Sequence, residues 1–137
     1  MKLPKKIIDA NVILRFFLAD DEKQSQKAGE FIQALEAGYD EALLTEMVFA
    51  EVVWVLQKVY AVPRAEIASK FSLLIQGLGI KTVTSKAIFI EALKIYARTG
   101  IDIQDIFLSV LAQSHNCTVV TFNKRDFIKL GCENSAP

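Results

Sequence analysis

The feature that most constrains the fold is the alternation of short apolar segments with longer helical patterns. Residues 6–9, 42–45, 80–83 and 117–121 are short, mostly apolar runs of the kind that form buried strands. The intervening residues carry apolar side chains at helical spacing, and no Asn-Gly turn typical of a β-hairpin occurs. This order predicts an α/β fold in which helices cover both faces of a parallel sheet.

The ends of the predicted helices are marked by residues that favour helix starts and stops. Asp20 and Asp21 are acids for a first helical turn, and Thr45, Ser85 and Asp102 are placed to cap later helices. The predicted helices cover residues 12–18, 20–38, 45–60, 64–76, 85–100, 102–116 and 126–130.

Length and composition predict one domain over residues 1–137. The chain has 137 residues, 52% of them apolar, with 16 basic and 16 acidic side chains. A net charge of zero removes the argument for a broad basic surface, so any nucleic-acid contact must be local. Two cysteines without metal-ligand spacing favour a reducing, cytoplasmic setting. No apolar run is long enough for a signal peptide or a membrane span.

Acidic side chains fall where ligands bind in open parallel sheets, beyond the carboxyl ends of the strands. Asp9 ends the first predicted strand, Asp105 lies in the first turn of the helix before the fourth, and Asn123 and Asp126 follow the fourth. Each position also has a simpler interpretation. Asp9 could cap the following helix, Asp105 could bond back to the amide of Asp102, and Asp126 could be an ordinary first-turn acid.

Glu51 is the most unusual residue of its predicted helix. Its neighbours on both sides are almost all apolar, so we expect its carboxylate to be at least partly buried. Burying an unpaired carboxylate is costly, and a metal ion could offset that cost. The alternative is that Glu51 reaches a helix edge or meets a lysine.

Other polar and aromatic residues are weaker candidates. His115 is the only histidine, and we interpret it as a solvated residue at a helix end. The large aromatic side chains are expected in the core; they are Phe16, Phe17, Phe31, Phe49 and Trp54.

Four blocks in a fixed order resemble the PIN-domain family, in particular the VapC-like ribonuclease toxins of toxin–antitoxin pairs. The blocks are Ile8-Asp9-Ala10-Asn11-Val12, Phe49-Ala50-Glu51-Val52-Val53, Asp102-Ile103-Gln104-Asp105-Ile106 and Val120-Thr121-Phe122-Asn123-Lys124-Arg125-Asp126-Phe127. Many members of the family carry aspartate where this chain has Asn123. Either Asn123 or Asp126 could complete the site.

The resemblance implies a three-layer α/β/α fold with a central, mostly parallel sheet of four to five short strands. It also implies a metal-dependent endoribonuclease that uses Asp9, Glu51 and Asp105 to hold Mg²⁺ or Mn²⁺. The expected supporting polar residues are Asn11, Thr45 and Thr121, and the candidate contacts to the RNA backbone are Arg15, Lys124 and Arg125. An antitoxin protein and a second copy of the chain are the implied partners. A degenerate PIN domain that binds RNA or protein without cleavage is the alternative.

Overall fold

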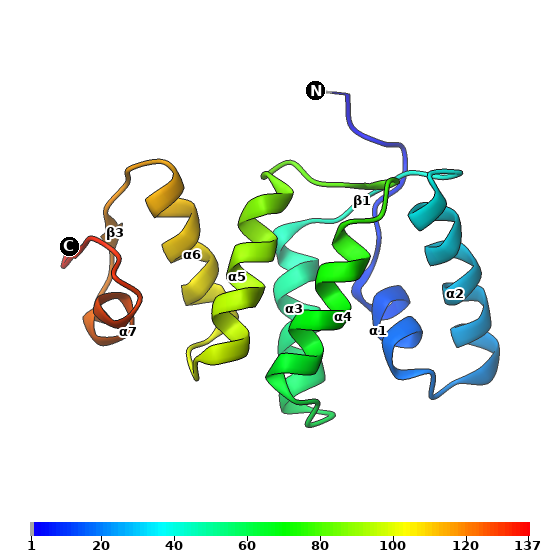
Figure 1. The fold of residues 1–137 in the computed structure, drawn as a ribbon, viewed down its shortest axis with the longest axis horizontal. Coiled ribbons are helices and arrows are strands. Elements are labelled where there is room, and N and C mark those ends of the chain that lie inside the picture. The colour runs from blue at the N-terminus through cyan, green and yellow to red at the C-terminus, as the bar shows by residue number, and fades with distance from the viewer. Residues whose placement is uncertain (1) are drawn as a thin grey trace.

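The computed structural model describes residues 2–137, over which seven helices and four two-residue strands follow one another. The helices stand in a row from α2 at one end through α4 and α5 to α6, and β3 and α7 lie at the opposite end (Figure 1). The elements are α1 (Ala10–Leu18), α2 (Glu22–Ala37), β1 (Ala42–Leu43), α3 (Glu46–Lys58), α4 (Arg64–Ile75), β2 (Ile80–Lys81), α5 (Lys86–Arg98), α6 (Ile103–Ser114), β3 (Val119–Val120), α7 (Lys124–Lys129) and β4 (Asn134–Ser135).

The helix starts confirm the predicted caps at Thr45 and Ser85, show Asp21, expected as a first-turn acid, to be the cap of α2, and show no capping hydrogen bond from the side chain of Asp102. The Asp21 carboxylate accepts a hydrogen bond from the Gln24 amide at 2.9 Å, and the Thr45 hydroxyl accepts one from the Val48 amide at 3.2 Å. Ser85 caps α5 in the same way. Such bonds satisfy amides that have no partner inside the helix, which is why these residue types mark helix starts.

The first three predicted strands pair in parallel, as expected. β1 pairs with β2, with Ala42 opposite Ile80. Ile7 adds an isolated parallel bridge to Leu43, and the Ile8 amide donates to the Leu43 carbonyl at 3.0 Å. Ile8 therefore ends a short extended segment whose next residue is Asp9.

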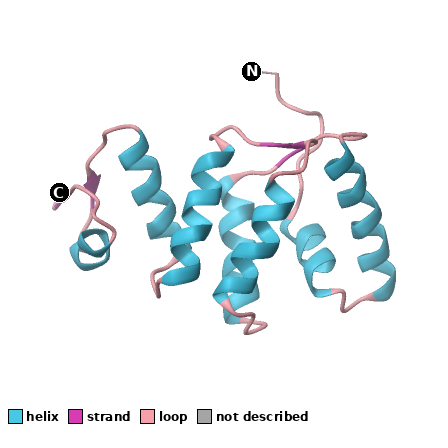
Figure 2. Cartoon of the chain, in the orientation of Figure 1, coloured by secondary structure: helices cyan, strands magenta, loops and turns pink. Residues whose placement is uncertain are grey.

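The fourth predicted strand does not join this sheet. β3 pairs in parallel with β4, a strand that the sequence did not predict, and the two pairs form separate sheets (Figure 2). A central sheet of four to five strands is thus not confirmed. Strands of two residues form few ladder hydrogen bonds, so helix packing holds most of this structure together.

The main core is built around Phe49 of α3. Its ring lies 5.0 Å from those of Phe71 and Phe89 and 5.9 Å from that of Phe107, measured between centroids. These contacts join α3 to α4, α5 and α6 around buried aliphatic side chains. Within residues 2–137, no helix combines the length and apolar character that a membrane crossing requires.

A second, much smaller cluster lies under the C-terminal segment. Ala112, Phe127 and Cys132 are its buried members, and they belong to α6, α7 and the loop before β4. Val119 and Leu130 pack against it. The C-terminal segment therefore has its own small core.

Gly79 fixes the approach of α2 to the start of β2. Its amide donates to the Leu35 carbonyl at 2.7 Å, and its carbonyl accepts from the Ala42 amide at 2.9 Å. A Cβ atom at this position would lie 1.9 Å from the Asp40 carbonyl oxygen. Only glycine allows the backbones to come so close.

Candidate functional site

A cavity of about 780 Å³ lies where the end of the first extended segment, α3 and the start of α6 meet. We call it the acidic cavity. Its lining includes the carboxylates of Asp9, Glu51 and Asp102 and no lysine, arginine or histidine. The other lining residues are Met47, Val48, Ala50, Val53, Trp54, Gln57, Ile103 and Gln104.

Asp9 has a structural task as well as a place in this cavity. It is the N-cap of α1, and its Oδ1 accepts a hydrogen bond from the Ala10 amide at 3.0 Å. The capping interpretation is therefore confirmed. The capping bond uses Oδ1 of Asp9 and does not involve Oδ2. A cap and a ligand role are compatible in one aspartate.

Glu51 is exposed, so the expectation that its carboxylate is partly buried was wrong. The side of α3 that carries Glu51 also exposes Met47 and Trp54, and it faces the acidic cavity rather than the core. The apolar sequence around Glu51 does not distinguish a buried helix side from an exposed apolar one. Trp54, expected in the core, is 55% exposed.

Asp105 lies in a second acidic group, which we call the Asp105 cluster: Asp105, Asn123 and Asp126. The Asn123 side-chain amide donates to Asp126 at 2.9 Å and to Asp105 at 3.3 Å, so it bridges the two carboxylates. The Thr121 hydroxyl accepts a hydrogen bond from the backbone N–H of Asn123 at 2.8 Å. Asp105 does not bond back to the amide of Asp102, contrary to the alternative drawn from the sequence.

The electrostatics of Asp105 connect the cluster to the acidic cavity. Burial raises the pKa of Asp105 above its usual value, and the negative charges of Asp102 and Asp126 raise that pKa further. The hydrogen bond from Asn123 acts in the opposite direction. The Asp105 carboxylate thus sits in a negative field, which a cation would relieve.

The donor set suits Mg²⁺ or Mn²⁺, because these ions prefer carboxylate and amide oxygens. Asp9 and Glu51 share the acidic cavity with Asp102, while Asp105 lies in the neighbouring cluster. Among residues 2–137, no three Asp, Glu, His or Cys side chains are grouped tightly enough to hold a metal ion. The chemistry of the donors fits a divalent cation, and the donors are divided between two adjoining groups.

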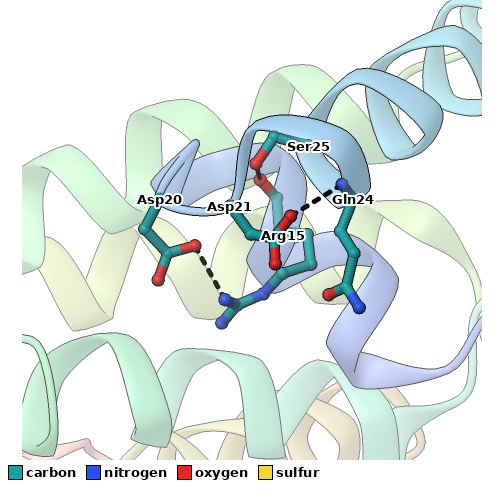
Figure 3. A network of polar contacts seen from close by, with 5 residues as sticks. All are labelled: Arg15, Asp20, Asp21, Gln24 and Ser25. Carbon is teal, nitrogen blue, oxygen red and sulfur yellow. Dashed lines mark hydrogen bonds and ion pairs between the residues drawn. The ribbon is translucent and has the colours of Figure 1, made fainter.

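Arg15, a candidate RNA contact, is already engaged at the end of α1. Its guanidinium pairs with Asp20 at 2.7 Å, and its carbonyl accepts from the Ser25 hydroxyl at 2.9 Å (Figure 3). Asp21 caps α2 beside this pair. Arg15 thus joins α1 to the start of α2, which is a structural task.

The other predicted polar residues lie at several places in the fold. Lys124 and Arg125 are exposed at the start of α7, and neither forms an ion pair within residues 2–137. Asn11 lines a different cavity, between α1 and α2, and Thr45 caps α3. His115 is the exposed C-cap of α6, as expected.

Sequence reasoning missed Asp102 and Trp54 as residues of the acidic cavity. Asp102 was considered only as a helix cap, yet its side chain makes no capping hydrogen bond. Trp54 follows Glu51 by three residues, which places both on one side of α3. That spacing was the available signal for Trp54.

Comparison with known proteins adds one match. The family model of the PIN domain matches residues 6–131, almost the whole chain and both acidic groups. A comparison with curated proteins finds no match. PIN domains are generally nucleases that use divalent metal ions.

Proposed function

Since this chain belongs to the PIN domain family, we propose that it is a metal-dependent endoribonuclease that hydrolyses RNA phosphodiester bonds. The observation that carries the proposal is the acidic cavity, where three carboxylates occur without one basic side chain. Such a cavity repels RNA phosphates unless a cation compensates its charge.

The proposed ligand residues are Asp9, Glu51 and Asp105, with Asp102 as an addition from the cavity lining. A divalent cation there would lower the pKa of water and balance the charge of the phosphate. The amide of Asn123 holds Asp105 and Asp126 together, so Asn123 contributes a neutral contact and Asp126 a further charge. Exposed Lys124 and Arg125, which directly follow Asn123, are the proposed contacts to the RNA backbone.

We further propose that the protein acts as the toxin of a VapC-like type II toxin–antitoxin pair and forms a homodimer. Support for a protein-binding surface comes from a mainly apolar cavity of about 240 Å³ lined by Phe16 and Phe17 of α1 and Leu73 of α4. Leu73 is 69% exposed. Light scattering should show that the wild type is a dimer and that Leu73→Glu dissociates at higher protein concentrations. A wild type that is monomeric at every concentration would contradict the proposed homodimer.

A catalytically degenerate PIN domain that binds RNA or protein is the second candidate. It is favoured by Asn123, a neutral residue between two acids, and by the division of the donors between two groups. Cleavage assays separate the two candidates.

The test measures metal binding and RNA cleavage in the same variants. The chain has one tryptophan, Trp54, and it lines the acidic cavity, so paramagnetic Mn²⁺ bound there should quench its fluorescence. Glu51→Gln should weaken this quenching and abolish Mg²⁺-dependent cleavage of single-stranded RNA. Glu91→Gln, an exposed change on α5, is the matched control and should do neither.

Two results would decide against the proposal. RNA cleavage that persists in EDTA would rule out metal-dependent chemistry. RNA binding without cleavage in any divalent metal would favour the degenerate alternative.

A further inference from the structure

Trp54 is a large aromatic residue on the exposed side of α3. It lines the acidic cavity on α3, with 55% of its surface open to solvent. Large aromatic side chains are usually well buried, and an exposed one beside a polar cavity is a frequent ligand contact. The exposed indole of Trp54 is therefore suited to bind a ligand that has a flat, apolar face.

Gln57 lies beside Trp54 and has an oriented amide. The buried hydroxyl of Tyr96 donates to Gln57 Oε1 at 2.7 Å. The Arg64 guanidinium lies over the Tyr96 ring at 3.7 Å from its centroid, and Arg64 Nε donates to the Tyr96 carbonyl at 2.8 Å. The Tyr96 hydroxyl occupies Gln57 Oε1, and no other side-chain hydrogen bond to Gln57 forms within residues 2–137, so Gln57 Nε2 is left as a donor.

The protonation state of Tyr96 supports this assignment. Burial raises the pKa of Tyr96 above its usual value, so the phenol keeps its proton at neutral pH. A protonated phenol has a hydrogen to donate, in agreement with its bond to Gln57 Oε1.

Glu51, Trp54 and Gln57 follow one another at three-residue intervals along α3. A helix rises about 1.5 Å per residue, so the three residues span roughly 9 Å along the axis of α3, and successive ones are neighbours on its surface. All three line the acidic cavity. An indole and an oriented amide thus lie one and two turns from a proposed metal ligand.

We propose that Trp54 and Gln57 form a base-binding subsite for single-stranded RNA within the acidic cavity. The indole stacks on one unpaired base, and Gln57 Nε2 donates to a carbonyl oxygen of that base. Uracil and guanine present a carbonyl where cytosine and adenine present an amino donor, so the subsite prefers uracil and guanine. This inference rests on the proposed ribonuclease function, which supplies the phosphate site.

The composition of the cavity favours RNA over a protein at this place. Three carboxylates and two carboxamides, those of Gln57 and Gln104, line the same cavity as Trp54. A dry protein interface would bury these groups without partners, which is costly. A base edge with its phosphate and cation can satisfy both kinds of group.

The first experiment follows the fluorescence of Trp54, the only tryptophan, during titration with a ten-residue oligouridylate in Ca²⁺. We expect saturable quenching, and none from an abasic strand of the same length. Affinity for labelled oligouridylate, measured by anisotropy, should fall about tenfold or more in Trp54→Ala and far less in Trp54→Phe. Equal melting temperatures would show that both variants are folded.

The second experiment tests Gln57 by the ratio of affinities for oligouridylate and oligocytidylate. Gln57→Glu keeps an acceptor for Tyr96 but replaces the free donor by an acceptor, so the ratio should reverse in favour of cytosine. Gln104→Glu is the control, because it adds the same charge to the same cavity at a residue that does not bond to Tyr96. It should lower the affinities for oligouridylate and oligocytidylate by the same factor.

The outcomes separate this inference from the function on which it rests. RNA binding or cleavage with unquenched Trp54 would overturn the subsite alone, as would an unchanged ratio in Gln57→Glu. Trp54 emission that changes with protein concentration in the absence of RNA would assign this surface to a second copy and overturn the subsite. Failure to bind or cleave RNA in any divalent metal would overturn the ribonuclease proposal itself.

Discussion

Asp9 combines two roles that one substitution alone would confuse. It caps α1 through a 3.0 Å hydrogen bond and also lines the acidic cavity. Asn is as good an N-cap as Asp, whereas Ala is not. A pair of substitutions can therefore separate the cap from the chemistry.

We expect Asp9→Asn to keep the stability of the metal-free protein within a few tenths of a kcal/mol, and Asp9→Ala to cost about 1 kcal/mol. Both should lose metal-dependent cleavage. Urea denaturation in EDTA and RNA cleavage assays measure the two effects. Full activity in Asp9→Asn would leave Asp9 with the cap role only.

The stability of the protein should depend on pH through Asp105. Its pKa is raised in the folded protein, chiefly by burial and then by Asp102 and Asp126. Protonation therefore favours the folded state, and the ionised carboxylate destabilises it at neutral pH. In EDTA at pH 7, Asp105→Asn should melt at a higher temperature than the parent protein.

This difference should shrink as the pH falls through the raised pKa of Asp105, and it should vanish below the usual value of 3.8, where both states are protonated. The Asn side chain keeps an oxygen that accepts from Asn123, so the hydrogen bond is not lost. Melting curves at several pH values provide the measurement. A difference that is constant with pH would contradict the electrostatic cause.

At the scale of single residues, the sequence predicted the strand-end and helix-start positions of the candidate site residues but not their surroundings. Asp9, Asp105 and Asn123 are recognisable because strand ends and helix starts are local patterns. The exposure of Glu51 and Trp54 was not recognisable, because an apolar helix side has the same sequence whether it faces the core or a cavity.

At the scale of elements, the helices were predictable and the sheet was not. The predicted caps at Thr45 and Ser85 bond to neighbours in the sequence, and each is confirmed by its hydrogen bond. Strand pairing depends on residues far apart in the chain, and strands of two residues carry little pattern. The missed β4 is such a strand.

Substitution of two glycines, one in close contact with the backbone of another segment and one without such a contact, tests how closely the elements pack. Gly79→Ala should destabilise the protein by about 2 kcal/mol or more, because its Cβ would meet the Asp40 carbonyl oxygen. Gly29 lies inside α2 with no atom near its missing Cβ, so Gly29→Ala should stabilise the protein by about 0.5–1 kcal/mol. Thermal denaturation measures both. Equal effects would contradict the close approach at Gly79.

At the scale of the whole molecule, the helices stand in a row in which neighbours pack against each other, and within residues 2–137 no single sheet joins the two ends (Figure 1). The sequence predicted the order of the elements but not this arrangement, which results from the packing of α5 against α4 and α6. The helices α3 and α6, which line the acidic cavity, are held by the main core through Phe49 and Ile103. Asn123 and Asp126 belong to the C-terminal segment, which is held by the small cluster.

The small cluster of Ala112, Phe127 and Cys132 has a consequence for local unfolding. So few buried side chains give the C-terminal segment a lower free energy of opening than the main core has. A thiol reagent should modify exposed Cys117 at once. It should modify buried Cys132 at a higher rate than the rate expected if Cys132 reacted only after unfolding of the whole protein. Because this segment holds Asn123 and Asp126, heating should abolish RNA cleavage at a temperature where the rest of the protein is still folded.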